Sequence, residues 1–348
     1  MDKFRPCTEP TRDIVASDFN LHCSQMTDSA SLTEVFGFLK NERADVRKMA
    51  MEGIATNSMN NNEMSKYLQD NPTELETMLS LLNMKEKPLL GQLLSALINI
   101  ATVEPLAKAM AESKGINRVI RLYDGFQREA DPEKTVAQQE MCLMLLNNMT
   151  ASHITAVNDF LQVDDEDLQG YNLESMKVHY DRQPDESARS QKSWFLKICL
   201  NLTRSGEGQE MLVNDEEWFG EVVSLVGDKD ADPRLVSIAL QIAHHCCAQK
   251  SLVAIVATKG FPGALAQRTT CFDGIPASIQ HVAMEALEAI MTDEAGMQAL
   301  EEINAKKYLV TYSEDSKTPK EVAEFVKQQL VPFLDDINDV FVVNEDDD

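Results

Sequence analysis

The amino-acid sequence predicts an all-α protein built as a solenoid of about six to seven helical repeats. The 348 residues are rich in strong helix formers, whereas aromatic residues make up only 6% and glycine and proline occur only 14 and 12 times. A second observation is a short apolar motif, interrupted by one polar or small residue, that recurs six times along the chain. A solenoid also accommodates a chain of this length, because each repeat packs only on its neighbours.

The recurring motif ends the more apolar helix of each repeat. Aligned on the apolar residue that follows the polar one, the copies lie 44 to 53 residues apart. This spacing is close to the roughly 40–47 residues of armadillo and HEAT units. The two longest intervals contain insertions near residues 127–133 and 164–190. We therefore predict an armadillo- or HEAT-like repeat domain over residues 31–334. The aligned apolar residues are Ile54, Ile100, Met149, Leu202, Cys246 and Ile290.

Local signals place several helix ends within this frame. Asp232-Pro233 has the order expected of an N-cap acid followed by a first-turn proline. Ser31–Glu34 and Thr318–Glu321 have capping-box spacing, which predicts two further helix starts. Gly115 and Gly260 each follow a lysine at the end of a helical pattern, so we expect them to end helices.

The two ends of the chain depart from the repeat pattern. We expect residues 1–30 to be loosely ordered, and the first 19 residues lack the apolar stretch of a secretion signal. Residues 335–348 contain seven acidic residues and no basic one, which predicts an acidic, partly disordered tail.

Charge and cysteine usage narrow the possible partners and compartment. A net charge of −25 repels phosphate, so nucleic acid and anionic membranes are poor partners. The acidity serves solubility or, alternatively, attraction of a basic client surface. The cysteines are odd in number, seven, and four of them lie in apolar helical stretches, which is typical of free thiols in a reducing compartment. Together with these thiols, the lack of a secretion signal and of any run of 18 apolar residues leads us to expect a cytoplasmic protein.

The polar position inside the motif supplies the candidate partner-binding residues, which are Asn99, Asn148, Asn201 and His245; Gly53 and Ala289 occupy the same position in the first and last copies. In an armadillo stack, side chains at one repeat position form a ladder along the groove, and an Asn amide can pair with both backbone groups of an extended peptide. The alternative is structural: these side chains bond the free carbonyls at helix ends and hold the turns between repeats. The residues alone leave both interpretations open.

The sequence predicts neither catalysis nor a cofactor. The run His244–Cys247 does not form a metal site by spacing, because neighbouring helical residues point about 100° apart. No His-Glu dipeptide occurs, although HEAT-type di-iron hydroxylases use such pairs as ligands. Phosphate-binding loops and hydrolase motifs are also missing from the sequence. We therefore expect a protein that is not an enzyme and binds no metal.

An ordered set of blocks resembles one armadillo-like family. These blocks are Leu145–Thr150, Cys199–Leu212, Asp232–Cys247 and Ala283–Glu294. Together they are similar to the Hgh family, with departures at His244-His245 and Ala248 and a poor match beyond residue 305. The resemblance implies an armadillo-like cytosolic co-chaperone that brings newly made elongation factor 2 to the TRiC/CCT chaperonin.

Two other binding roles are compatible with the repeat pattern. One is a nucleotide-exchange factor for Hsp70, a role that other short armadillo proteins fill. The other is a scaffold of the importin or catenin kind. Importin-like grooves pair the Asn ladder with tryptophans on the same helices, whereas Trp194 and Trp218 do not occupy ladder positions here.

Overall fold

The computed structural model describes residues 29–59, 62–130, 135–183 and 191–334, and all the regular structure in these ranges is helical. The chain divides into two compact units, residues 1–159 and 160–348. The predictions of a loosely ordered N-terminal segment and an acidic tail fall almost entirely outside the described residues. None of the described helices combines the length and apolarity needed to span a bilayer.

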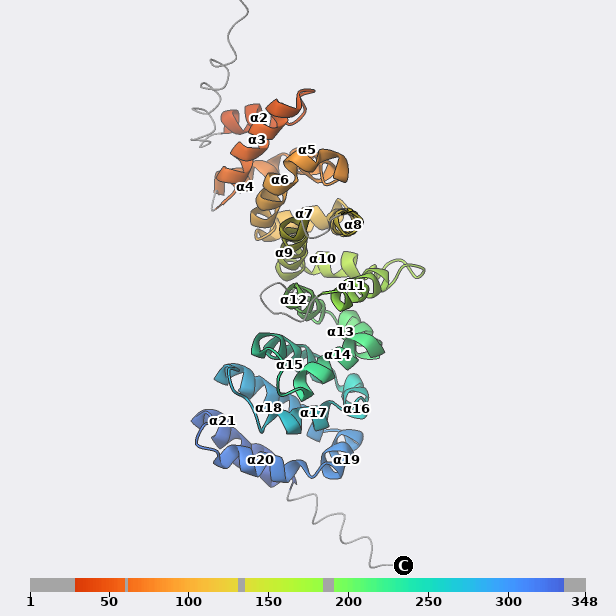
Figure 1. Ribbon diagram of the computed structural model, residues 1–348, viewed down its shortest axis with the longest axis vertical. Coiled ribbons are helices and arrows are strands. Elements are labelled where there is room, and N and C mark those ends of the chain that lie inside the picture. Colours follow the sequence, from red (N-terminus) through yellow and green to blue (C-terminus); the bar gives the residue numbers. More distant parts are fainter. Residues whose placement is uncertain (1–28, 60–61, 131–134, 184–190, 335–348) are drawn as a thin grey trace, which may run out of the picture. The chain divides into compact units, whose positions relative to one another are not determined.

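The described part of unit 1 holds a pair of helices followed by two triplets, and the last helix of each group is the longest (Figure 1). These last helices, here called inner helices, are α3, α6 and α9, and α6 packs against both of the others. The helices are α2 (Ser29–Phe38), α3 (Ala44–Asn57), α4 (Asn62–Asp70), α5 (Pro72–Ser80), α6 (Lys87–Ile100), α7 (Glu104–Glu112), α8 (Gly115–Gln127) and α9 (Val136–Ser152), with a short 3₁₀ turn η1 (Met84–Glu86).

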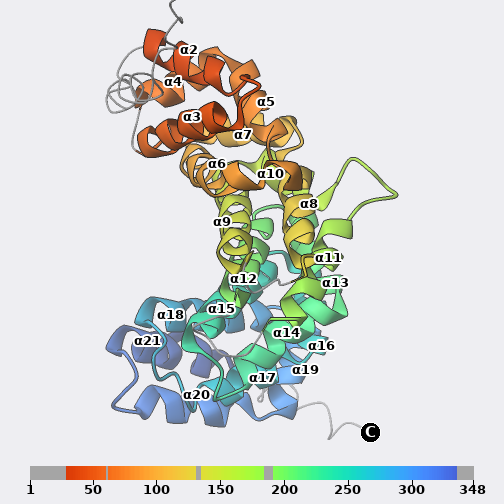
Figure 2. The same ribbon diagram turned by 45° about the horizontal axis from the view of Figure 1, so that its top comes forward.

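Unit 2 continues the same arrangement after α10 (Ile154–Leu161), within which the boundary between the units falls. Its inner helices α12, α15, α18 and α21 follow one another along one side of the unit, and α13, α16 and α19 follow the opposite side (Figures 1 and 2). The helices are α11 (Tyr171–Asp181), α12 (Lys192–Leu202), α13 (Gly206–Asn214), α14 (Glu216–Gly227), α15 (Pro233–Cys247), α16 (Lys250–Thr258), α17 (Phe261–Arg268), α18 (Ala277–Met291), α19 (Glu294–Glu302), α20 (Ala305–Glu314) and α21 (Lys320–Phe325), followed by the π-helical turn η3 (Val326–Leu330).

The predicted repeat frame is confirmed by burial. All six aligned apolar residues lie on inner helices and are at most 2% exposed. The helix α21 with η3 adds a seventh inner element that packs on α18. The motif is therefore the sequence mark of an inner helix whose apolar residue enters the core shared by neighbouring repeats.

Part of one predicted insertion is a helix of the repeat, and residues 184–190 of it lie outside the described residues. The acidic, polar character of residues 164–190 suggested an insertion, but α11 forms inside this stretch as the middle helix of the fourth repeat. Trp218 is buried and its indole N–H donates to the carbonyl of Leu173 at 3.0 Å, which fixes α11 on the next repeat. The apolar residues buried on one face of α11 are sufficient to hold it as a helix, although the stretch as a whole is polar.

The helix-end signals have mixed outcomes. Asp232 does cap α15, since its carboxylate accepts from the backbone N–H of Arg234 at 2.9 Å. The two capping boxes are wrong: α2 begins before Ser31, and the Thr318 hydroxyl donates to the carbonyl of Tyr312 at 2.6 Å instead of capping α21.

The two glycines expected to end helices play different roles. Gly260 adopts a left-handed φ of 85° directly after α16, as predicted. At the other site Lys114 takes the left-handed conformation, and Gly115 is the first residue of α8. A Cβ at Gly115 would lie 2.6 Å from the carbonyl oxygen of Met110, so this glycine permits a close approach of backbones.

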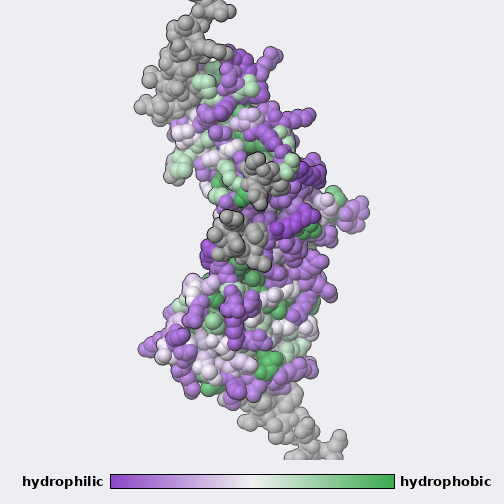
Figure 3. Space-filling model, viewed as in Figure 1, coloured by the Kyte–Doolittle hydropathy of each residue, from purple (hydrophilic) through white to green (hydrophobic). Residues whose placement is uncertain are grey.

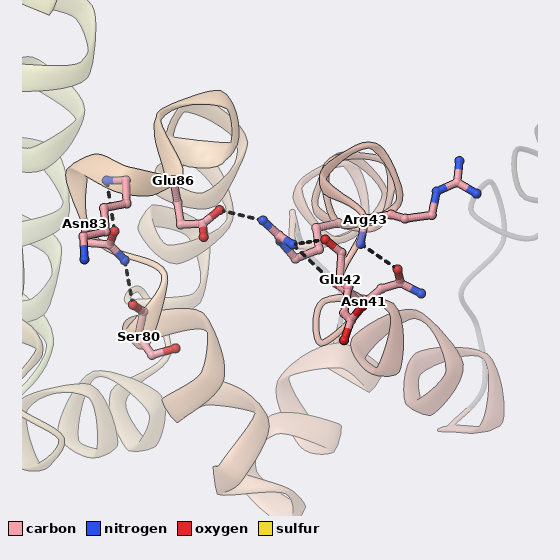
Figure 4. Close-up of polar contacts among 8 residues, drawn as sticks. Asn41, Glu42, Arg43, Ser80, Asn83 and Glu86 are labelled. Carbon is pink, nitrogen blue, oxygen red and sulfur yellow. Dashed lines mark hydrogen bonds and ion pairs between the residues drawn. The ribbon is translucent and has the colours of Figure 1, made fainter.

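Neighbouring inner helices of unit 1 are joined at their N-terminal ends. The Arg47 guanidinium donates to the carbonyls of Asn41 and Glu42 at 3.0 and 3.1 Å, and it pairs with the Glu86 carboxylate at 3.2 Å (Figure 4). Asn41 and Glu42 precede α3, and Glu86 precedes α6. The side chains of Arg47 and Glu86 are only 20% and 25% exposed, so this pair is better shielded from water than a typical surface ion pair.

A buried arginine closes one helix end in unit 2. Arg268 is 2% exposed and donates to the carbonyls of Val226 at 2.8 Å and Leu225 at 3.3 Å, and also to that of Asp228. The first two carbonyls belong to the last turn of α14, where intrahelical donors run out. Burial lowers the pKa of this guanidinium, and the carbonyl dipoles compensate its charge.

Two glycines allow the first helix of a repeat to press against the preceding inner helix. A Cβ at Gly208 or Gly296 would lie 2.1 Å from a backbone oxygen, that of Leu202 or Ile290 respectively. Leu202 and Ile290 are the aligned apolar residues of their repeats, and each glycine follows six residues later. The same contact therefore recurs in two repeats.

We predict that Gly208→Ala and Gly296→Ala each destabilise the protein by about 1–3 kcal/mol, because the added methyl group must displace backbone. The matched control is Gly220→Ala in α14, where a Cβ meets nothing within 4 Å and alanine should stabilise by about 0.5–1 kcal/mol. Urea denaturation followed by circular dichroism measures the difference. Equal effects of the three substitutions would contradict the proposed close contact.

Candidate protein-binding face

The four candidate residues lie at equivalent places on inner helices. Asn99 and Asn148 belong to α6 and α9 of unit 1, and Asn201 and His245 belong to α12 and α15 of unit 2. Each directly precedes a buried apolar residue and is itself half-buried. The structure thus gives the ladder positions a common environment within each unit.

In unit 1, both asparagine amides bond the preceding repeat. Asn99 Nδ2 donates to Ser58 Oγ at 2.9 Å, and Ser58 Oγ donates in turn to the carbonyl of Ala55 in the last turn of α3, at 2.8 Å. Asn148 Nδ2 donates directly to the carbonyl of Ile98 in the last turn of α6, at 3.1 Å. These contacts match the structural interpretation, in which ladder side chains satisfy helix-end carbonyls.

His245 makes an equivalent link in unit 2. Its Nδ1 lies 2.7 Å from Thr203 Oγ1, and Thr203 Oγ1 donates to the carbonyl of Leu200 in α12 at 2.6 Å. Because the hydroxyl proton is directed to Leu200, we assign the ring proton to Nδ1, which then donates to the hydroxyl. The chain of contacts from ladder residue to hydroxyl to carbonyl is the same as that from Asn99 through Ser58.

The hydroxyl partners were missed at the sequence level. Ser58 and Thr203 directly follow α3 and α12, and Ser152 at the end of α9 donates to the carbonyl of Ala101 at 2.7 Å. A Ser or Thr shortly after most copies of the motif was a usable signal. Which group each hydroxyl bonds depends on how neighbouring repeats stack, and the sequence does not show that stacking.

Other side chains occupy the open side of the inner helices in unit 2. Lys197 lies over the ring of Trp194, with its ammonium 4.1 Å from the ring centroid. Trp194 is on α12, two helical turns before Asn201. It is not at a ladder position, but it lies on the same helix as a ladder residue. Trp218, by contrast, is in the core.

The neighbouring inner helices add imidazole and carboxylate groups to this side. Glu285 of α18 lies 3.6 Å from His244 Nε2 of α15 and 3.7 Å from His281 Nε2. The ring of His281 also contacts that of Phe325 of α21 edge-on, with centroids 4.8 Å apart. Aromatic, cationic, imidazole and carboxylate side chains therefore follow one another over α12, α15, α18 and α21. We call these residues of unit 2 the inner-helix face; they are Trp194, Lys197, Asn201, His244, His245, His281, Glu285 and Phe325.

Four thiols on the inner helices are held in their neutral form by burial. Burial raises the pKa of Cys247 to about 12 and raises the pKa of Cys142, Cys199 and Cys246 further. These four are free and buried, as predicted. Within the described ranges, no three His, Cys, Asp or Glu side chains are grouped so that they could hold a metal ion.

Comparison with solved structures shows the fold class. An engineered protein matches with a TM-score of 0.66 and 15% identity over 86% of this chain and 67% of its own. Two further engineered proteins match with TM-scores of 0.56, at 15% and 16% identity, over 74% and 75% of this chain and 96% and 98% of theirs. No protein-family model and no curated protein sequence matches the chain. The protein is an all-α helical-repeat solenoid.

We predict that Asn148→Ala destabilises the protein by about 0.5–2 kcal/mol, because the Ile98 carbonyl loses its donor. Asn148→Asp should cost more than alanine, since a carboxylate of the same shape cannot donate and would face a carbonyl oxygen. Thermal and urea unfolding measure both. If neither variant lowers stability, the amide has no structural role and the ladder interpretation based on partner binding gains weight.

A second prediction concerns pH. Burial, together with the neighbouring His244, lowers the pKa of His245 in the folded protein. The unfolded chain then binds this proton more readily, so the stability contributed by His245 is complete above about pH 6.5 and falls as the pH drops toward the folded pKa.

His245→Asn keeps a donor for Thr203 and removes this titration. Unfolding free energies measured from pH 7.5 to 5 should therefore fall more steeply in the wild-type protein than in His245→Asn. Parallel curves for the two proteins would refute the assignment.

Proposed function

We propose that this protein is a protein-binding adaptor that acts as a co-chaperone and uses the inner-helix face of unit 2 to hold a client. The observation that carries the proposal is the row of half-exposed side chains over consecutive inner helices, with Trp194 stacked under Lys197. Tryptophan side chains held in place by packing are among the groups that contribute most to protein interfaces. Differential affinity for free and engaged client would be sufficient for this role.

The proposed client is newly made elongation factor 2, handed to the TRiC/CCT chaperonin. Support for this client comes from the resemblance of residues 145–150, 199–212 and 232–247 to the Hgh family. The acidic chain, with a net charge of −25, also suits a client with basic surface. We place the protein in the cytoplasm and assign it no catalytic activity and no cofactor.

The test is affinity capture of the tagged protein from its own cytosol, with quantitative mass spectrometry. We expect elongation factor 2 and chaperonin subunits, and we expect at least a severalfold loss of the client with Trp194→Ala/Lys197→Ala. Lys250→Ala/Gln267→Ala, exposed positions on α16 and α17, is the matched control.

Recovery of neither elongation factor 2 nor chaperonin would overturn the proposal. Hsp70 would point instead to nucleotide exchange, which release of labelled nucleotide from Hsp70 would check. Import cargo would point to an importin-like scaffold, in which Trp194 and Asn201 on one helix would contribute to the groove.

A further inference from the structure

The connection between α10 and α11 displays apolar side chains away from the core. Leu168 in this loop and Tyr171 and Val178 on α11 are 43%, 59% and 49% exposed. The loop extends away from both helices in two views (Figures 1 and 2). On the segment that projects at the right edge of Figure 3, hydrophobic surface is surrounded by hydrophilic surface.

The loop has a defined shape. Its ends are joined by the Gly170 N–H, which donates to the carbonyl of Leu161 at 3.0 Å, and Gly170 has a left-handed φ of 81°. The Asn172 amide is buried and donates to the carbonyl of Phe160, also at 3.0 Å. The Tyr171 N–H donates to the carbonyl of Leu168 at 3.0 Å, which closes a turn between the two residues. Such clamped ends are typical of a compact Ω-type loop.

The core does not use the exposed side of α11. Leu173, Met176 and Tyr180 occupy the buried side, where the ring of Tyr180 lies 5.3 Å from that of Trp218. Tyr171 and Val178 are seven residues apart, which puts them on one face of the helix. Exposed tyrosine and aliphatic side chains at this spacing are not needed for the packing of unit 2.

Carboxylates surround this apolar strip. Residues 164–167 are four consecutive acids in the loop, and Glu174 lies between Tyr171 and Val178; all five are exposed. The positive charge of Lys177 does not neutralise these carboxylates at the surface, because its side chain is only 9% exposed. Its ammonium pairs with Asp181 at 2.6 Å and lies 5.8 Å from the centroid of the Trp218 ring. Arg182 follows at the far end of the helix.

We propose that this acidic apolar strip, made of Leu168, Tyr171 and Val178 with residues 164–167 and Glu174, is a docking site for a basic amphipathic segment of another protein. The apolar residues would be covered by apolar residues of that segment, and its Lys and Arg side chains would face the carboxylates. Phosphate-rich partners are repelled by the same charges. The site is separate from the inner-helix face, and it does not depend on the client proposed above.

The test uses a fluorescein-labelled amphipathic peptide of about 18 residues built from Leu and Lys, long enough for five helical turns. Its binding to the full-length protein is followed by anisotropy at about 50 and 300 mM salt, where charge screening differs. Leu168→Ser/Tyr171→Ser leaves the net charge unchanged and should raise Kd about tenfold or more. Phe333→Ser, at a residue 44% exposed elsewhere in unit 2, is the matched control and should leave Kd unchanged.

Charge is tested separately. Replacing residues 164–167 by Asn and Gln should weaken binding of the peptide and reduce its salt dependence. The control removes the same charge elsewhere in unit 2 and should have a smaller effect; it places Gln at the exposed residues Glu301, Glu302, Glu321 and Glu324. A peptide with Ser in place of Leu should bind more weakly than the amphipathic one.

Equal losses from the two acid sets, or no change with Leu168→Ser/Tyr171→Ser, would show that net charge alone attracts the peptide and would overturn the proposal. Circular dichroism and thermal melts establish that the variants are folded. Failure here leaves the affinity-capture result unaffected, because that experiment probes Trp194 and Lys197.

Discussion

Every helix in a solenoid ends with carbonyl groups that lack intrahelical donors, and the way the next repeat supplies these donors organises the structure. Asn148 and Ser152 reach back to α6, and Arg268 reaches back to α14. Asn99 and His245 do the same through an intervening hydroxyl. Apolar packing brings the helices together, and these directional bonds select the register at which one repeat stacks on another.

The sequence was sufficient to locate the inner helices because their motif combines two constraints in a few residues. Ile100 and Cys246 must be buried, and the residue before each must tolerate a half-buried position. Such local requirements recur with each repeat, so they are visible as periodicity. The position of α11 was obscured because the four acids before it and its own exposed Glu174 give this stretch the composition of a loop.

The contacts of the candidate site could not be derived in the same way. That Asn99 meets Ser58, or that His245 meets Thr203, depends on the rotation between successive helices, and small changes in it would bring other side chains together. The capping boxes failed for a related reason: the Thr318 hydroxyl found a carbonyl outside its own helix. The tertiary arrangement of the helices, and not the local capping preference of the sequence, determined these contacts.

These contacts assign the stacking of repeats and the binding of a partner to different side chains of the inner helices. Asn99, Asn148 and His245 bond the neighbouring repeat, while Trp194, Lys197, His244 and His281 occupy the open side of the inner helices. Proteins of this kind can vary the open residues with little effect on stacking, since the stacking bonds lie elsewhere. The acidic apolar strip near α11 is a second surface whose residues can be substituted without altering the core.

The close contacts at Gly208 and Gly296 restrict where the chain can gain length during evolution. The same number of residues separates Leu202 from Gly208 and Ile290 from Gly296, so an inserted residue there would pull the helix off its neighbour. The connection between α10 and α11, residues 162–170, is longer, and a Cβ at its glycine, Gly170, would meet nothing within 4 Å. Relatives that differ in length are thus expected to differ in the connections within a repeat and not in the one that follows an inner helix, so that the register of the stack is preserved.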